Sequence, residues 1–128
     1  MDILLDTHAF LRWVEDDTLL SAKARAAIED RDNRVHLSAA SAWELASKRS
    51  IGKLKLALPV DRYIASHLEA NGFSWLPIEL QDIAVVESLP MHHRDPFDRL
   101  LIAQAKARKL AIVSADAAFS NYRVKRIW

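Results

Sequence analysis

The sequence contains no cysteine, only two glycines and no apolar run that approaches the length of a membrane-spanning helix. Without cysteine, neither disulfide bonds nor thiolate metal sites can form. Two glycines, Gly52 and Gly72, cannot supply the glycine-rich loops of the common nucleotide-cofactor enzymes. Asp2 stands where a secretory signal would carry basic charge. We therefore expect a cytoplasmic protein without a membrane segment.

The chain has 128 residues, of which 51% are hydrophobic, and this predicts one domain over residues 1–128 with a substantial core. Its formal net charge of +1 neither indicates nor excludes a nucleic-acid partner, because a net charge averages over local patches. The distribution of charged residues along the sequence is therefore more informative than their total.

The stretch Met91 to Gln104, MHHRDPFDRLLIAQ, predicts a central helix. Asp95 can cap the first turn, and Pro96 suits the first helical position because it loses no hydrogen bond there. Apolar residues then surround the helix almost completely, which indicates cover on several sides. Asp98 falls on a largely buried stripe, where an unpartnered charge is destabilising. It needs a cation, a hydrogen-bond network or a basic side chain.

Short apolar runs alternate with helical segments along the rest of the chain. We expect strands at 3–5, 35–38, 73–77, 110–114 and 124–128. The expected helices, besides the central one, are 7–15, 22–31, 41–50, 60–70, 79–89 and 117–120. Residues 50–58 alternate lysine with leucine but are expected to form a loop. This order predicts a three-layer α/β/α sandwich with a mainly parallel sheet of four to five strands.

Four acidic residues are expected to converge at the carboxyl edge of this sheet. Asp6 and Asp116 each follow a strand, whereas Glu44 and Asp98 lie near the start of helices that begin at the same edge. Carboxylates held together raise one another's pKa unless a cation intervenes, and oxygen ligands suit Mg²⁺ or Mn²⁺. A divalent cation is therefore the simplest partner for Asp98.

Each acid also has an ordinary structural interpretation. Asp6 and Asp116 could be helix caps, and Glu44 could be a solvated helix residue. Asp98 could form an ion pair with a neighbouring arginine. Taken together, these interpretations require several coincidences, whereas a single metal site accounts for all four residues.

Four segments carry these acids: LLDTHAFLRW, SAWELASKRSIGKLKL, HHRDPFDRLLIAQA and IVSAD. In sequence and in order they resemble the PIN-domain ribonucleases, specifically the toxins of VapBC-type toxin–antitoxin pairs. The resemblance implies an endoribonuclease dependent on Mg²⁺ or Mn²⁺. Its catalytic and metal-binding residues would be Asp6, Glu44, Asp98 and Asp116. It also implies an RNA substrate and a homodimer bound to a small antitoxin.

The same resemblance places supporting residues around the acids. Thr7 and Ser114 match hydroxyl positions beside the first and last acids, although Ser114 is more often threonine in the family. We interpret Asp95 as a helix cap that supports the ligands without binding the ion itself. Carboxylate-held metal ions activate water and clamp the phosphate, so no protein nucleophile is required. One ion and two ions are both compatible with four acids.

Basic side chains near the acids are expected to contact RNA phosphates, namely those of Lys48, Arg94 and Arg99. For the basic cluster near the end of the sequence, an ordinary solvated surface is the favoured interpretation. That cluster contains Arg123, Lys125 and Arg126. Three histidines could act as ligands or bases, although Mg²⁺ prefers oxygen. They are His8, His92 and His93.

Receiver-type domains and haloacid-dehalogenase-type phosphatases also gather acids at a sheet edge. They need adjacent acids after the first strand or a DxD motif, and Asp6, Thr7 and His8 offer neither. The remaining alternative is a non-catalytic PIN-like module that binds a partner, against which the presence of all four acids argues. Trp13 and Trp75 could serve a partner interface, although core packing is the commoner use of tryptophan.

Overall fold

The computed structural model describes residues 1–128 and contains a five-stranded parallel sheet with the order β3-β2-β1-β4-β5. The strands are β1 (Asp2–Leu5), β2 (Arg34–Ser38), β3 (Ser74–Leu76), β4 (Ala111–Val113) and β5 (Arg126–Ile127). The central strand is β1, where Leu4 is paired with His36 of β2 and with Ile112 of β4. The predicted parallel sheet is confirmed.

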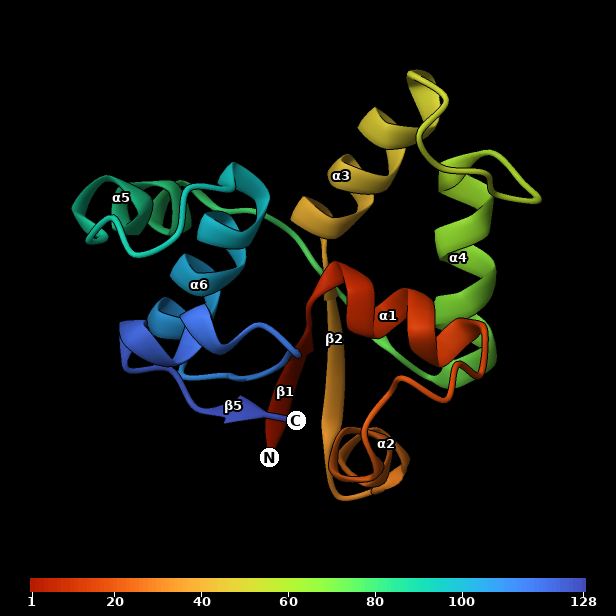
Figure 1. Cartoon of the computed structure of the whole chain (residues 1–128), viewed down its shortest axis with the longest axis horizontal. Helices are drawn as coiled ribbons and strands as arrows, with labels where there is room; N and C mark the ends of the chain where they lie inside the picture. Colours follow the sequence, from red (N-terminus) through yellow and green to blue (C-terminus); the bar gives the residue numbers. More distant parts are fainter.

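Seven helices cover the two faces of this sheet (Figure 1). They are α1 (Thr7–Val14), α2 (Ala22–Glu29), α3 (Ala39–Ser50), α4 (Val60–Asn71), α5 (Leu80–Ser88), α6 (Pro96–Arg108) and the 3₁₀ helix η1 (Ala117–Tyr122). None of them has both the length and the hydrophobicity needed to span a membrane.

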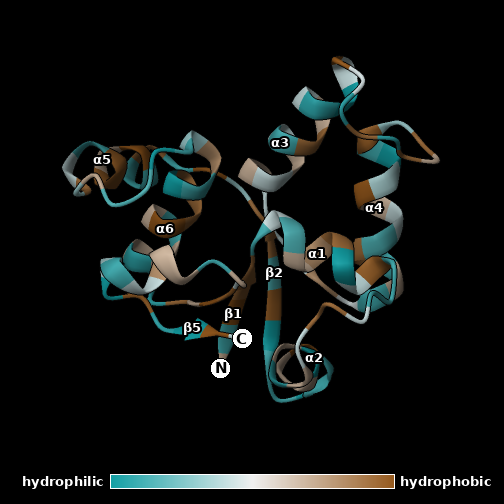
Figure 2. Cartoon of the chain, viewed as in Figure 1, coloured by the Kyte–Doolittle hydropathy of each residue, from teal (hydrophilic) through white to brown (hydrophobic).

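Alternate side chains of β1 point into two separate apolar clusters, because successive residues of a strand face opposite sides of the sheet. Ile3 and Leu5 pack with residues of α1, α2 and α4, whereas Leu4 packs with residues of α5, α6 and η1. Figure 2 shows β1 as a hydrophobic strand at the centre of the molecule. The predicted three-layer α/β/α sandwich is therefore confirmed.

The central helix α6 begins where its sequence predicts. Asp95 is the N-cap, and its carboxylate accepts a hydrogen bond of 2.9 Å from the backbone N–H of Asp98. Pro96 occupies the first turn, and Leu101 and Ile102 are completely buried. Proline and a capping carboxylate thus fix the direction in which α6 leaves the preceding loop.

Several boundaries differ from those expected from the sequence. Helix α3 begins at Ala39, two residues before the expected start, because Ser38 caps it by accepting a hydrogen bond of 2.9 Å from the N–H of Ala40. The strand expected at 124–128 contains only two residues, because Arg123 adopts a left-handed conformation and β5 has one neighbour, β4. The segment between α3 and α4 contains no strand, as predicted.

Candidate metal centre

Asp6 and Asp116 both follow strands of the sheet and both cap a helix. Asp6 is 5% exposed and accepts a hydrogen bond of 2.7 Å from the N–H of Ala9 at the start of α1. Asp116 caps η1 through Oδ1, which accepts a bond of 2.9 Å from the N–H of Ala118. Its second oxygen, Oδ2, contacts His93. Capping therefore uses only one oxygen of Asp116 and does not exclude a second role.

His93 joins two of the predicted acids. Its Nε2 atom lies 3.1 Å from Oδ2 of Asp98 and 2.9 Å from Oδ2 of Asp116. The ligand atoms of these three residues lie within 4.8 Å of one another. The other ring nitrogen, Nδ1, accepts a hydrogen bond of 3.2 Å from the N–H of Asp95. This bond leaves the ring hydrogen on Nε2, so His93 donates toward both carboxylates.

The pKa of Asp98 is raised to about 7, chiefly because the carboxyl group is buried and because Asp95 lies nearby. The contact with His93 lowers this pKa, and the negative charges of Asp6 and Glu44 raise it further. Asp98 therefore lies within electrostatic range of three other carboxylates, those of Asp95, Asp6 and Glu44. Excess negative charge is thus a property of this edge of the sheet.

Burial also raises the pKa of Asp6, against the hydrogen bonds from Ser114 and from the N–H of Ala9. Ser114 is completely buried, and its hydroxyl oxygen accepts a bond of 3.0 Å from the N–H of Asp116. The Ser114 hydroxyl therefore lies between the first and last acids. Thr7 donates to the Ser41 hydroxyl at 3.0 Å and joins the start of α1 to α3. Both hydroxyls position elements that carry acids.

Glu44 is only 3% exposed, so its alternative interpretation as a solvated helix residue is wrong. One helical turn further along α3, the Nζ atom of Lys48 lies 2.5 Å from Oε2 of Glu44. The Lys48 side chain remains 40% exposed. It neutralises Glu44 while its ammonium group stays accessible from solution, which is compatible with the predicted contact to a phosphate.

The prediction that Arg99 contacts RNA is wrong. Its side chain is buried and lies beside the loop between α5 and α6. The guanidinium group donates to four backbone carbonyl oxygens and to the hydroxyl of Tyr122, and the carbonyls belong to Val86, Leu89, Pro90 and His93. Arg99 therefore holds this loop in place. Asp98 is paired with His93 and not with an arginine, and Arg94 is exposed.

Two aromatic residues at the rim of the site were not singled out from the sequence. Trp43 is 54% exposed, and its ring centroid lies 4.9 Å from that of Phe97 in an edge-to-face arrangement. Trp43 immediately precedes Glu44, and Phe97 immediately precedes Asp98. An aromatic residue directly before each acid is a sequence signal for this pair, which joins α3 to α6.

The donor set fits a hard divalent cation, which prefers oxygen ligands. Asp98 and Asp116 belong to the compact group with His93, whereas Asp6 and Glu44 lie outside that group of ligand atoms. The pKa of Asp98 is raised first by burial and then by the neighbouring carboxylates, and a cation bound there would offset both effects. Asp98 and Asp116, together with His93, are the residues whose ligand atoms lie close enough to one another to hold a metal ion.

The architecture and the site together define a class: a parallel α/β/α protein with an acidic centre at the carboxyl edge of its central strands. Residues 3–125 match the PIN domain, and the chain belongs to this family. PIN domains are generally nucleases and typically use divalent metal ions. A comparison with curated protein sequences gives no significant match.

Solved structures share the fold at low sequence identity. VapBC2 from Rickettsia felis, bound to a DNA fragment from its promoter, is 12% identical with a TM-score of 0.73 and full coverage of both chains. VapBC-1 from nontypeable Haemophilus influenzae is 14% identical, with a TM-score of 0.65 and coverage of 98% of this chain and 96% of the other. FitAcB from Neisseria gonorrhoeae is 21% identical, with a TM-score of 0.59 and the same coverage.

Replacing His93 by glutamine is expected to lower the melting temperature of the metal-free protein by about 3–6 °C, equivalent to about 1 kcal/mol. Glutamine can donate to one carboxylate but cannot bridge Asp98 and Asp116 as the imidazole does. Added Mg²⁺ should reduce the difference in melting temperature between His93→Gln and wild type, because the cation offsets the negative charge of Asp98 and Asp116. Thermal melts in EDTA and in Mg²⁺ measure both effects. The exposed neighbour His92 provides the control, and equal melting of His93→Gln and His92→Gln would contradict this role.

Proposed function

We propose that the protein is an endoribonuclease dependent on Mg²⁺ or Mn²⁺ that acts as the toxin of a toxin–antitoxin pair. The observation that carries the proposal is the environment of Asp98. Its carboxylate lies near three other acids and has His93 as its partner, and its pKa is raised to about 7. A divalent cation would offset this concentration of negative charge.

Each side chain of the centre has a distinct role in this proposal. Asp98 and Asp116 would hold the ion, with Asp6 and Glu44 completing its oxygen ligands. When bound, the ion supplies a Lewis acid for the phosphate and a more acidic water. Ser114 fixes Asp6 and Asp116, and Asp95 fixes the His93 ring through its N–H.

The site also needs groups that receive RNA. Lys48 contacts Glu44, and Arg94 is exposed in the residue after His93; we assign to both the attraction of the phosphate backbone. The exposed ring of Trp43 offers a face on which a base could stack, at the rim of the same site. No side chain has to act as a nucleophile, because the attacking group in this mechanism is water.

Two exposed apolar surfaces support the proposed partners. An apolar groove of about 380 Å³ lies between α3 and α4, where Trp75 is 46% exposed beside Ile64 and Leu68. We assign this groove to the antitoxin, in line with the toxin–antitoxin names of the structures that share the fold. On α5, Leu80 and Ile83 are exposed, and this surface suits a second copy of the chain.

The direct test is cleavage of RNA by the purified protein, free of any antitoxin. We expect cleavage in Mg²⁺ or Mn²⁺ and a loss of more than about a hundredfold in EDTA, because the carboxylates alone cannot activate water. Restoring the metal should restore the activity. Gel analysis of a labelled RNA measures the rate, and cleavage that continues undiminished in EDTA would exclude the metal mechanism.

The alternative is a PIN-like module that binds a partner without cutting. It predicts no metal-dependent cleavage at any protein concentration, although the partner would still bind. The proximity of Asp98 to Asp95, Asp6 and Glu44 argues against this alternative, because repulsion among carboxylates is destabilising when no cation offsets it.

A further inference from the structure

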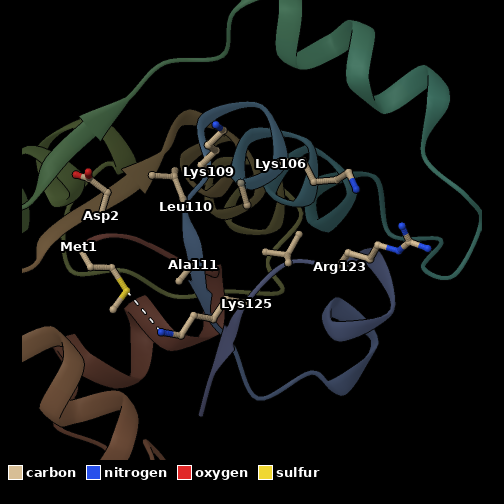
Figure 3. Close-up of a pocket in the computed structure, with 10 residues that line it drawn as sticks. Met1, Asp2, Lys106, Lys109, Leu110, Ala111, Arg123 and Lys125 are labelled. Atoms are coloured by element: carbon tan, nitrogen blue, oxygen red, sulfur yellow. Dashed lines mark hydrogen bonds between the residues drawn. The ribbon is translucent and has the colours of Figure 1, made fainter.

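A basic pocket lies at the opposite edge of the sheet from the acids, at the amino ends of β1, β4 and β5 (Figure 3). Its volume is about 430 Å³, and its lining comes from the first two residues, the end of α6 and the segment before β5. Four exposed cationic side chains surround it: Lys106, Lys109, Arg123 and Lys125. The single acid in the lining is Asp2.

The positive charge of this basic pocket has no carboxylate partner. Asp2 is engaged elsewhere, because its Oδ1 atom lies 3.0 Å from Nε2 of His36 and this hydrogen bond lowers the pKa of Asp2. Lys106 donates to the carbonyl oxygen of Tyr122 at 3.0 Å, and Lys125 contacts only the sulfur of Met1, at 4.0 Å. None of the four cations forms a salt bridge.

Stabilisation of the helix end accounts for only part of this arrangement. Lys106 and Lys109 lie at the carboxyl end of α6, where positive charge offsets the helix dipole. Arg123 is the C-cap of η1, a different helix, whereas Lys125 lies between η1 and β5 and belongs to no helix end. The tertiary fold places these two residues beside the α6 lysines. The basic cluster near the end of the sequence is therefore part of a defined pocket.

A second cavity adjoins the basic pocket on the side of the loop between α5 and α6. It has a volume of about 360 Å³ and shares Lys106 and Arg123 with the basic pocket. Its lining also includes His92, the neighbour of the His93 that contacts Asp98 and Asp116. Cationic side chains of α6 and of the segment after η1 therefore extend from the far edge of the sheet toward the loop that carries His93, and we call this array the basic path.

We propose that this path binds the phosphate backbone of single-stranded RNA on one side of the cleaved bond. This inference rests on the proposed function and extends it to a second binding site. The four residues of β1 span roughly 13 Å at the usual rise per residue. A few nucleotides of extended RNA can therefore reach from the acids to the basic pocket. Since the lining offers cations and no exposed aromatic ring, binding should be independent of base sequence.

The test is a variant that removes three charges without disturbing the backbone: Lys109→Asn, Arg123→Asn and Lys125→Gln. Lys109 and Arg123 have φ angles of 57° and 60°, a conformation that asparagine tolerates well. The matched control removes three exposed cations elsewhere, through Lys23→Gln, Arg31→Gln and Arg62→Gln. Both variants change the net charge equally, so a difference between them reports the position of the charge.

Binding is measured in EDTA by fluorescence anisotropy of a labelled single-stranded RNA of about 20 nucleotides, over a range of salt concentrations. We expect the pocket variant to bind about tenfold more weakly than wild type and the slope of log K against log salt to fall by about 2. The control variant should change the affinity by less than about threefold. A dinucleotide, too short to reach from the acids to the pocket, should bind all three proteins alike.

Equal weakening by the two variants, an unchanged salt slope, or no RNA binding in EDTA would overturn the inference. Tighter binding of duplex DNA that the pocket variant abolishes would also overturn the assignment to RNA. Binding in EDTA does not depend on cleavage, so the two proposals can fail separately. A protein that cuts RNA but binds it independently of the pocket refutes only the second site, and a protein that binds through the pocket without cutting refutes only the nuclease.

Discussion

Replacing Asp98 by asparagine is expected to lower the rate of RNA cleavage by more than about a thousandfold, equivalent to about 4 kcal/mol in the activation free energy. Oδ2 of Asp98 lies in the compact group with His93 and Asp116. Asparagine has nearly the same volume and can still accept the hydrogen bond from His93. It carries no negative charge for a divalent cation, so the loss should come from the metal-dependent step.

The matched control for this variant is Asp95→Asn. Asp95 accepts a hydrogen bond from the N–H of Asp98 as the cap of α6, and asparagine caps a helix equally well. Removing its charge also removes one of the causes that raise the pKa of Asp98. Asp95→Asn should therefore keep its activity within about tenfold of wild type. If both variants prove equally inactive in a single-turnover assay, the division of roles between the two acids is wrong.

The same substitution, Asp98→Asn, is expected to raise the melting temperature of the metal-free protein by about 5–10 °C near pH 8. The pKa of Asp98 is about 7 in the folded protein and 3.8 for an ordinary aspartate. Between these values the folded state binds more protons than the unfolded state, so wild-type stability falls as the pH rises. Asparagine does not titrate. The difference in melting temperature between wild type and Asp98→Asn should be small near pH 4 and largest above pH 7.

Added Mg²⁺ should remove much of this difference in melting temperature between Asp98→Asn and wild type. An ion that binds only the folded state, at a concentration ten times its dissociation constant, raises the free energy of unfolding by about 1.4 kcal/mol. For a domain of this size, this raises the melting temperature by roughly 3–6 °C. Wild type should gain this amount in Mg²⁺, and Asp98→Asn should gain less. Melts of both proteins across pH, with EDTA and with Mg²⁺, provide the measurement. A metal-free Asp98→Asn that melts below wild type at pH 8 would show that repulsion among the acids does not dominate there.

Local chemistry explains which parts of the fold were predictable. Asp95 and Pro96 define the start of α6 through interactions within one helical turn, so the sequence alone locates it. The alternation of apolar runs with helices likewise predicts the parallel sheet, because a crossover must pass over one face of the sheet. The pairing of Leu5 with both Leu37 and Val113 then brings the strand-end acids together.

The partners of individual side chains were less predictable, because distant segments provide them. Arg99 stands next to Asp98 in the sequence, yet its guanidinium group binds carbonyl oxygens of the loop between α5 and α6. That same loop, which has no periodic pattern, places His93 between two acids. Asp82 is completely buried against Arg108, and spacing along α5 gives no sign of this ion pair. Irregular backbone thus decides contacts that periodicity cannot predict.

The position of β1 has a consequence for how the chain folds during synthesis. This strand pairs with β2, which follows soon after it, and with β4, which is made much later. Its β4 edge remains unpaired until Ala111–Val113 emerge from the ribosome, and open apolar edges favour aggregation. Asp6 and Asp116 cannot approach each other before that pairing. A nascent chain therefore carries most of the acids of the centre without their final arrangement, and any hydrolytic activity begins only after β1 has paired with β4.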